Sequence, residues 1–241
     1  MWKVKFGRCI YTSPTGCKVY QNFLYRWLTF SDAAWQTVIN RYIPSNPILH
    51  YLKALTIMVR ANPSDCCLLG LGGAGVPHML VKGNQEHSIV AVDNSLDVIQ
   101  IAKKFFKADT IPNLTILHQN ANDFVRHNTE KFHHLLIDLY DSYHFPEDCH
   151  SLEFFQHCKN CLAENGYLAI NLANPKEQLS ILKLLKQVFN TSIVLTIPDC
   201  DNIVVILPQN GDRNSFIRAM NETHELKKIS WTTPWGYIAD Y

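Results

Sequence analysis

The regular alternation of strand-like and helix-like segments after residue 65 is the feature that most restricts how this chain can fold. Short apolar segments rich in β-prone side chains lie at residues 66–69, 88–93, 114–118, 133–138 and 166–171. Segments with helical periodicity lie between them, at residues 76–81, 96–106, 121–127 and 152–162. Strands that alternate with helices pair in parallel, because each crossover helix returns the chain to the same end of the sheet. The pattern therefore predicts an α/β fold with a doubly wound, mostly parallel sheet.

The segments after residue 174 extend this prediction. A helix over residues 175–189 precedes two strand-like segments, 192–197 and 203–207. Their short connection predicts an antiparallel hairpin that closes the edge of a seven-stranded sheet. This is the layout of the Rossmann-like fold of S-adenosylmethionine-dependent methyltransferases. The aromatic C-terminal segment, with Trp231, Trp235, Tyr237 and Tyr241, is expected to form a flap packed on the body.

The first part of the chain has a different pattern. Short β-prone segments at residues 3–11, 17–20 and 25–30, with a turn at residues 13–16, predict a small antiparallel sheet. A helix is expected over residues 50–60. We therefore expect a small N-terminal β-sheet region over residues 1–47 and a Rossmann-like catalytic domain over residues 48–241.

Composition excludes several kinds of partner. The chain has 22 Lys and Arg against 21 Asp and Glu, a net charge of +1, which predicts no strong attraction to nucleic acid or to an anionic membrane. It contains no apolar segment of the roughly 18 residues that a membrane span needs. The N-terminal residues lack the apolar segment and cleavage site of a secretory signal. We expect a cytoplasmic protein.

The eight cysteines do not predict a metal site. Cys158 and Cys161 form one CxxC pair, with Cys149, His150 and His157 nearby. A structural zinc site normally has a second such pair, and this one falls in a predicted helix rather than on a turn. Buried or half-buried reduced thiols, and no metal, are the expectation.

A glycine-rich turn follows the first strand of the predicted parallel sheet. Gly70, Gly72 and Gly75 fit the pattern GxGxxG, and Asp93 follows at the end of the next strand. Glycines allow a ligand to approach the backbone closely, and an acid at the second strand end accepts hydrogen bonds from ribose hydroxyls. The pattern predicts a ligand that contains adenosine, although a purely structural turn would also satisfy it.

Two carboxylates follow the fourth of these strands. Asp138 and Asp141 come directly after the apolar segment Leu135-Leu136-Ile137. Aspartates at such positions often cap helices or solvate loops. Two acids this close, however, gain from a shared cation and repel each other without one. A small amine substrate is the occupant that they predict.

Together these residues resemble the spermidine synthase, or polyamine aminopropyltransferase, family. The resemblance covers roughly residues 18–207, and its most specific part is the DxxD segment, followed by a gate loop and a helix with two adjacent phenylalanines. The matching positions are Gln36, Tyr51, Gly70 to Gly75, Asp93, Asn120-Ala121, Asp138 to Asp141 and residues 146–155.

The resemblance implies transfer of an aminopropyl group from decarboxylated S-adenosylmethionine to an amine such as putrescine, with release of 5′-methylthioadenosine. Asp138 would be the catalytic acid, and Asp141 and Tyr51 would hold the other end of the amine. The co-substrate would contact Gln36, the turn residues Gly70, Gly72 and Gly73, Asp93 through its ribose, Asn120 and Ala121 through its adenine, and Tyr140. This chemistry requires no metal.

The chain also departs from the family pattern. Gly73 stands where the family usually has an aspartate that recognises the aminopropyl amine, and Leu52-Lys53 replaces the usual His or Gln followed by Glu. The gate loop lacks the usual Asp-Pro junction, and the C-terminal substrate tyrosine has no counterpart. Lys53 would oppose a cationic substrate if it faced the pocket.

Other functions therefore stay open. A methyltransferase that uses ordinary S-adenosylmethionine is the first, because Gly73 leaves room for a carboxylate near backbone N–H groups. A non-catalytic relative that binds a nucleoside or a polyamine is the second. A nicotinamide dehydrogenase would not explain Gln36, the DxxD segment or the terminal hairpin. The family often forms dimers, which leaves a homodimer open.

Overall fold

The smaller of two β-sheets is formed by the N-terminal part of the chain. The computed structural model describes residues 6–30, 35–81, 83, 85–141 and 144–241. The small sheet is an antiparallel meander of β1 (Arg8–Thr12), β2 (Cys17–Gln21), β3 (Tyr25–Phe30) and β4 (Trp35–Asn40). This confirms the predicted N-terminal sheet; residues 3–5 of its first predicted segment lie outside the described residues. The sequence did not predict β4, because its apolar stretch, Val38-Ile39, is too short to stand out. The division of the chain at residue 47 stays a prediction.

The larger sheet contains nine strands in the order β12-β13-β10-β11-β9-β8-β5-β6-β7. Their bounds are β5 (Cys66–Leu69), β6 (Ile89–Asp93), β7 (Leu114–His118), β8 (Phe132–Ile137), β9 (Leu162–Leu172), β10 (Ile193–Thr196), β11 (Ile203–Pro208), β12 (Ile229–Thr232) and β13 (Gly236–Asp240). The five strands from β9 to β7 pair in parallel, as predicted. Their carboxyl ends therefore meet at one edge of the sheet.

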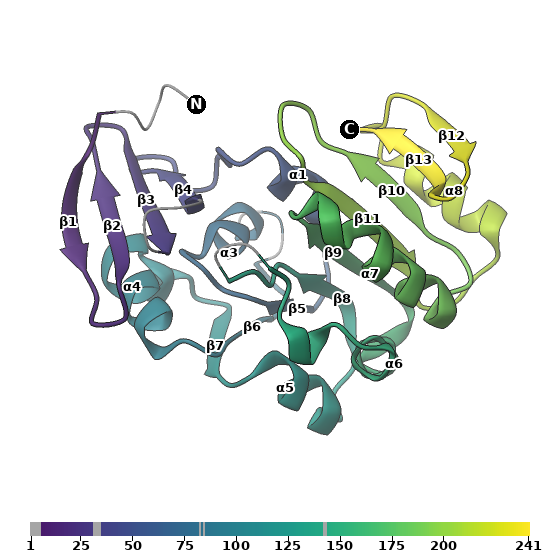
Figure 1. Ribbon diagram of the computed structural model, residues 1–241, viewed down its shortest axis with the longest axis horizontal. Coiled ribbons are helices and arrows are strands. Elements are labelled where there is room, and N and C mark those ends of the chain that lie inside the picture. Colours follow the sequence, from purple (N-terminus) through teal and green to yellow (C-terminus); the bar gives the residue numbers. More distant parts are fainter. Residues whose placement is uncertain (1–5, 31–34, 82, 84, 142–143) are drawn as a thin grey trace.

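The C-terminal end of this sheet differs from the prediction. The β10–β11 hairpin is present, but β11 lies between β9 and β10 and is antiparallel to both, so the hairpin does not close the edge. β13 pairs in parallel with β10, and β12 pairs antiparallel with β13, so the sheet has nine strands rather than seven. The backbone groups along β10 would otherwise be an open edge, and β13 provides their partners. The N-terminal sheet and these last strands lie at opposite ends of the molecule (Figure 1).

The aromatic C-terminal segment is therefore part of the sheet rather than a separate flap. Trp235, Tyr237 and Tyr241 do pack against the hydrophobic clusters of the body, as expected. Trp231 on β12 does not, and 63% of it is exposed. The preceding helix α8 (Arg213–Glu222) was also not predicted.

The other helices follow the predicted pattern closely. They are α1 (Tyr51–Leu55), α2 (Ile57–Ala61), α3 (Gly75–Leu80), α4 (Leu96–Phe106), α5 (Ala121–His127), α6 (Leu152–Asn160) and α7 (Pro175–Val188), with short 3-10 turns at Ala108–Thr110 and Glu147–Cys149. The predicted helix over residues 50–60 is divided at Thr56. Side-chain oxygens of Ser95, Asn120, Ser151 and Asn174 accept backbone N–H groups at the starts of α4, α5, α6 and α7.

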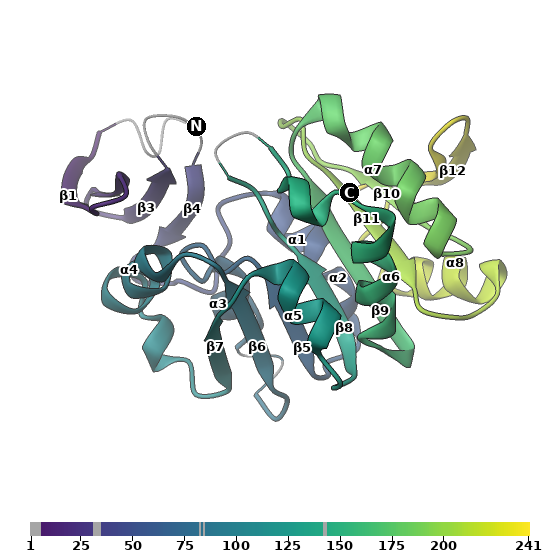
Figure 2. The same cartoon turned by 60° about the horizontal axis from the view of Figure 1, so that its bottom comes forward.

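Both faces of the large sheet are covered. Successive strand residues point to opposite faces, so Cys66 and Leu68 join one hydrophobic cluster while Cys67 and Leu69 join another. Figure 2 shows α5 and α6 in front of the sheet and the fainter α1 and α2 behind it. None of the helices in the described ranges has the length and apolar character of a membrane span.

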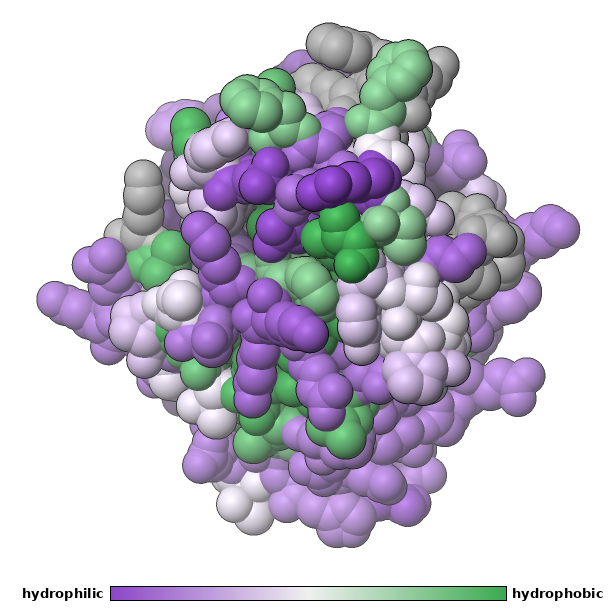
Figure 3. All heavy atoms as spheres, turned by 90° about the vertical axis from the view of Figure 1, so that its left-hand side faces the viewer, coloured by the Kyte–Doolittle hydropathy of each residue, from purple (hydrophilic) through white to green (hydrophobic). Residues whose placement is uncertain are grey.

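The small sheet packs on α4, whose Val98, Ile101 and Phe106 form a third cluster with Val19 and Leu28. Figure 3 shows the molecule from the side of this sheet, with hydrophilic side chains across the surface and hydrophobic ones in separate groups. Phe30 of β3 and Gln36 of β4 line the same cavity as Asp93 at the end of β6, so the small sheet lies beside the edge where the parallel strands end.

Candidate active site

A cavity of about 1580 Å³ lies at the carboxyl ends of the parallel strands, beside the N-terminal sheet. All predicted site residues except Gly73 line it: Gln36, Tyr51, Gly70, Gly72, Asp93, Asn120, Ala121, Asp138, Tyr140 and Asp141. These residues come from six separate parts of the chain, because parallel strands bring their following loops to one edge. The fold thus collects the predicted residues around one space.

Asp138 is held in the cavity wall by three parts of the chain. Its backbone N–H donates to the Leu69 carbonyl at 2.9 Å, which fixes the end of β8 beside β5. The Tyr51 hydroxyl donates to Oδ2 at 3.0 Å, and the Asn171 amide donates to Oδ1 at 2.8 Å. Burial raises the pKa of the Asp138 carboxyl, and these two hydrogen bonds partly oppose that shift. Asp138 is therefore an oriented carboxylate with a raised affinity for a proton.

Asn171 was missed by the sequence interpretation, although it lies in the predicted strand that became β9. It is buried, with 3% exposed, and its Oδ1 accepts a hydrogen bond from the Asn202 amide at 2.8 Å. Asn202 precedes β11, so the chain of hydrogen bonds runs from Asn202 through Asn171 to Asp138. A polar residue at the end of an apolar strand was the available signal.

Asp141 has different surroundings from Asp138. It is exposed at the mouth of the cavity, and its Oδ1 accepts the His144 N–H at 2.8 Å. Its backbone carbonyl accepts the Gln36 amide at 3.0 Å, which links β4 to the segment after β8. Residues 142 and 143 of the predicted gate loop lie outside the described residues. After this gap, the His144 imidazole nitrogen Nδ1 lies 2.7 Å from Oε1 of Glu177 on α7, and the Phe145 N–H donates to Oε2 at 3.1 Å.

The glycine turn leaves no room for side chains where it meets β8. Gly70 has φ +95°, and a Cβ there would lie 2.2 Å from the Asp138 carbonyl oxygen, so only glycine fits. Asp93 Oδ2 accepts the Leu71 and Gly72 N–H groups at 3.0 and 3.4 Å, and Oδ1 accepts that of Ser95 at 2.9 Å. Burial raises the pKa of Asp93, and these bonds oppose the shift. The carboxylate is fixed at the turn, beside the cavity.

Gly73 does not face the cavity. Its N–H donates to Thr37 Oγ1 at 2.7 Å, and a Cβ at this position would lie 2.9 Å from Thr37 Cγ2 and 3.0 Å from Phe106. The Thr37 side chain on β4 therefore occupies the space in which an aspartate side chain would begin. The Gly73 N–H is already bound to Thr37, so it is not free to bind a carboxylate.

Lys53 also does not line the cavity. It is exposed, and its charge contributes to lowering the pKa of Glu225. The buried Leu52 lines the cavity instead. The lysine therefore does not oppose a cation in this site.

Asn120, in the loop after β7, and Asp148 also line the cavity. Asn120 Oδ1 accepts the N–H groups of Asn122 and Asp123 at 2.8 and 3.1 Å and so caps α5, while its amide donates to Asp148 Oδ2 at 2.7 Å. Tyr140 lies edge-on to Phe145, with ring centroids 6.0 Å apart, and burial raises the pKa of its hydroxyl to about 12. Tyr140 therefore stays neutral in the wall.

The cysteines form no metal centre in the part of the chain that the structure describes. Burial raises the pKa values of the Cys67, Cys149, Cys158 and Cys161 thiols, which favours the protonated form. A thiol must lose its proton to bind zinc.

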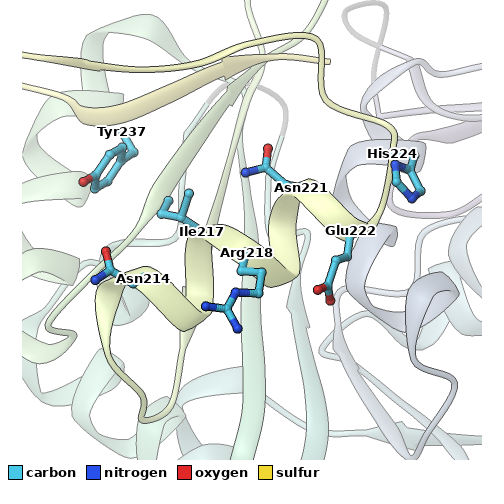
Figure 4. A pocket seen from close by; sticks show the side chains of 7 residues that line it. All are labelled: Asn214, Ile217, Arg218, Asn221, Glu222, His224 and Tyr237. Atoms are coloured by element: carbon cyan, nitrogen blue, oxygen red, sulfur yellow. The ribbon is translucent and has the colours of Figure 1, made fainter.

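A second, shallower hollow of about 390 Å³ lies on α8 (Figure 4). Five of its lining residues, among them Arg218 and Glu222, belong to α8, and the other two are His224 and Tyr237. None of the predicted site residues contributes to it. It lies away from the strand ends that carry the site.

Comparison with known proteins agrees with this geometry. The family model of the spermine/spermidine synthase domain matches residues 49–225. The chain belongs to this family. The match runs from before β5 to beyond α8 and includes strands β5 to β11 of the large sheet. It therefore contains most of the residues around the cavity.

Individual members of the spermidine synthase family are distant. The polyamine aminopropyltransferase of Buchnera aphidicola is 31% identical over 104 residues, which cover 41% of this chain and 36% of the relative. That of Prochlorococcus marinus (strain MIT 9312) is 27% identical over 184 residues, 72% of this chain and 64% of the relative. The matched segments thus span less than two thirds of either relative.

The fold is also that of a solved structure. A probable spermidine synthase from Corynebacterium glutamicum superimposes with a TM-score of 0.76 at 14% identity, over 90% of this chain and 85% of that one. At this identity the agreement supports the fold alone.

Proposed function

We propose that the protein transfers an aminopropyl group from decarboxylated S-adenosylmethionine to a small amine of the putrescine type, with release of 5′-methylthioadenosine. The observation that carries the proposal is the Asp138 carboxylate, oriented by Tyr51 and Asn171 in the wall of a cavity that also contains the glycine turn and Asp93. Family membership supports it, because curated relatives are polyamine aminopropyltransferases.

The proposed reaction needs an oriented neutral amine. The amine nitrogen attacks the methylene carbon next to the sulfonium, a C–N bond forms, and the C–S bond breaks with its electron pair passing to sulfur. Free amines with pKa values of about 10 are mostly protonated near neutral pH. The Asp138 carboxylate would orient the nitrogen and take up the proton that it loses. The raised pKa of Asp138 suits this role.

Other residues of the cavity would bind the two substrates. Asp93 and the glycine turn would hold the ribose, since the fixed carboxylate still has lone pairs for its hydroxyls. Tyr51 and the exposed Asp141 would bind the amine. Tyr51 stays protonated, because burial and the neighbouring Asp138 raise its pKa well above the usual value. No residue in this scheme requires a metal.

Methyl transfer from ordinary S-adenosylmethionine is the weaker alternative. Its main argument was a space and a free N–H at Gly73 for the methionine carboxylate. Thr37 fills that space and accepts that N–H. Asp138 and Asp141, which would bind the amine, also have no role in binding the carboxylate of ordinary S-adenosylmethionine.

The test is incubation of the full chain with decarboxylated S-adenosylmethionine and a panel of diamines, with methylthioadenosine measured by chromatography. We expect product with at least one diamine. Asp138→Asn should lower turnover by roughly 10²-fold or more, the contribution typical of a positioned base. Asp109→Asn, outside the cavity, is the matched control and should keep full turnover.

Several outcomes would contradict the proposal. Unchanged turnover in Asp138→Asn would remove this residue from the mechanism. Release of S-adenosylhomocysteine from ordinary S-adenosylmethionine, with no reaction of the decarboxylated form, would favour methyl transfer. Binding of the nucleoside without product under any pairing would favour the non-catalytic relative.

A further inference from the structure

We propose that Asp148 recognises the exocyclic amine of the nucleoside base, and that Asn120 is a positioning residue that orients Asp148. The inference rests on the proposed function, because it takes a 6-aminopurine nucleoside as the occupant of the cavity. It concerns a residue that the sequence interpretation did not place in the site.

The order of the strands indicates where the base lies. Asp138 follows β8 and Asp93 ends β6, with β5 and its glycine turn between them. A nucleoside with its ribose at Asp93 and its reacting sulfonium toward Asp138 must direct its base away from β8. The next loop in that direction, after β7, carries Asn120 and Ala121, and Asp148 lines the cavity beside them.

Asn120 has no acceptor left for an amine. An amide oxygen has two lone pairs, and both are used by the N–H groups of Asn122 and Asp123. The Asn120 NH₂ group is a donor, and it binds Asp148 Oδ2 at 2.7 Å. Since a 6-amino group also donates, Asn120 cannot recognise it directly.

Asp148 does have acceptor capacity. A carboxylate offers about four lone-pair sites, and Asn120 uses one of them. The Cys149 thiol shares a side-chain hydrogen bond with Asp148 and uses another. The bond from Asn120 fixes the plane of the carboxylate, so the remaining sites have a defined direction. A 6-oxo base would place its own oxygen against this carboxylate and would be rejected.

The test compares the binding of 5′-methylthioadenosine and 5′-methylthioinosine by calorimetry. One hydrogen bond to a charged acceptor corresponds to roughly tenfold to hundredfold in affinity, so the wild type should prefer the 6-amino nucleoside by that factor. In Asp148→Asn, the new amide can accept from Asn120 and turn its NH₂ toward the base. The preference should therefore fall at least tenfold or reverse.

Two further variants separate the roles. Asp123→Asn removes the same charge from the first turn of α5, outside the cavity, and should keep the wild-type preference. Asn120→Ser keeps a capping oxygen but replaces the amide donor to Asp148 with a shorter hydroxyl, which would hold the carboxylate less well, so affinity for methylthioadenosine should fall while the preference keeps its sign. Melting temperatures check that each variant is folded.

Two results would overturn the inference, and they differ in meaning. A wild-type preference retained in Asp148→Asn, together with its loss in Asn120→Ser, would assign base recognition to Asn120 and leave the proposed function intact. Binding of neither nucleoside to the wild type would contradict the proposed function, and this inference with it.

Discussion

At the scale of single residues, two aspartates of one short segment have acquired different properties. Asp138 is enclosed by Tyr51 and Asn171, while Asp141, three positions later, is exposed and accepts the backbone N–H of His144. Burial raises the pKa of Asp138, whereas hydrogen-bond donors stabilise its ionised form. The donors around Asp138 therefore decide the pH at which it can accept a proton.

This balance gives a prediction for Asn171→Leu. The substitution removes a donor that lowers the Asp138 pKa, so this pKa should rise further above its usual range. Asp138 must be ionised to accept a proton, so turnover falls as pH drops through its pKa. The acidic limb of the kcat–pH profile should move to higher pH by roughly one unit, the value of a hydrogen bond to a charged group.

Asn202→Ala is the control for this prediction, because it removes only the bond that orients Asn171. It should move the acidic limb less than Asn171→Leu does. An unmoved limb in Asn171→Leu would mean that Asn171 does not tune Asp138.

At the scale of elements, strand β8 is fixed at both ends by polar contacts. One end carries Asp138, and near the other end His134 binds the Asn62 carbonyl at 2.8 Å in the loop after α2. His134 is 1% exposed and stacks on Tyr167 of β9, with ring centroids 6.4 Å apart. Burial lowers its pKa from 6.5 to about 4. The strand thus contains a histidine that stays neutral in the folded protein.

The prediction concerns stability at acidic pH. Between pH 6.5 and about 4 the unfolded chain binds a proton at His134 that the folded chain does not, so stability is lost as pH falls through this range. The loss from this residue should approach about 3 kcal/mol, at about 1.4 kcal/mol for each pKa unit. Urea unfolding at several pH values measures it.

The matched variants are His134→Phe and His133→Gln. The first removes the titrating group and should flatten the dependence between pH 6.5 and 4, at some cost in stability near pH 7. The second changes the exposed neighbour and should keep the wild-type dependence. Equal slopes in all three proteins would mean that His134 does not control acid stability.

At the scale of the whole molecule, the two sheets meet at the glycine turn. Thr37 of β4 accepts the buried Gly73 N–H, and Gln36 beside it donates to the Asp141 carbonyl. The N-terminal sheet therefore supports the turn that would hold the nucleoside. The contact between Thr37 and Gly73 therefore links the small sheet to the shape of the glycine turn.

Thr37→Val tests this link, because it keeps the shape of the side chain and removes its oxygen. The Gly73 N–H would lose its partner, and the free energy of unfolding should fall by about 1–3 kcal/mol. Affinity for methylthioadenosine should fall as well, because the turn loses its support. Thr37→Ser keeps the acceptor and should lose less of both. Full affinity in Thr37→Val would separate the turn from the N-terminal sheet.

The sequence by itself determined the parallel sheet and which strand ends would carry the residues of the candidate site. Periodic apolar segments identify strands and helices, and parallel strands must bring their following loops to one edge. That rule is enough to group Gly70, Asp93, Asn120 and Asp138 before any coordinates are known. Their residue types also indicate chemistry: glycine lets a ligand approach the backbone, and a carboxylate at a strand end can accept hydrogen bonds from ribose hydroxyls or an amine.

Only the tertiary structure decided which partners surround these residues. Asn171 on Asp138, Thr37 on Gly73 and Asp148 on Asn120 are contacts between segments far apart in the chain. The same holds for β13, which pairs with β10 and extends the sheet to nine strands. Isolated Asn, Thr and Asp residues, and short strands, have no periodic signal, because their roles arise only when folding brings distant backbone and side-chain groups within hydrogen-bonding distance.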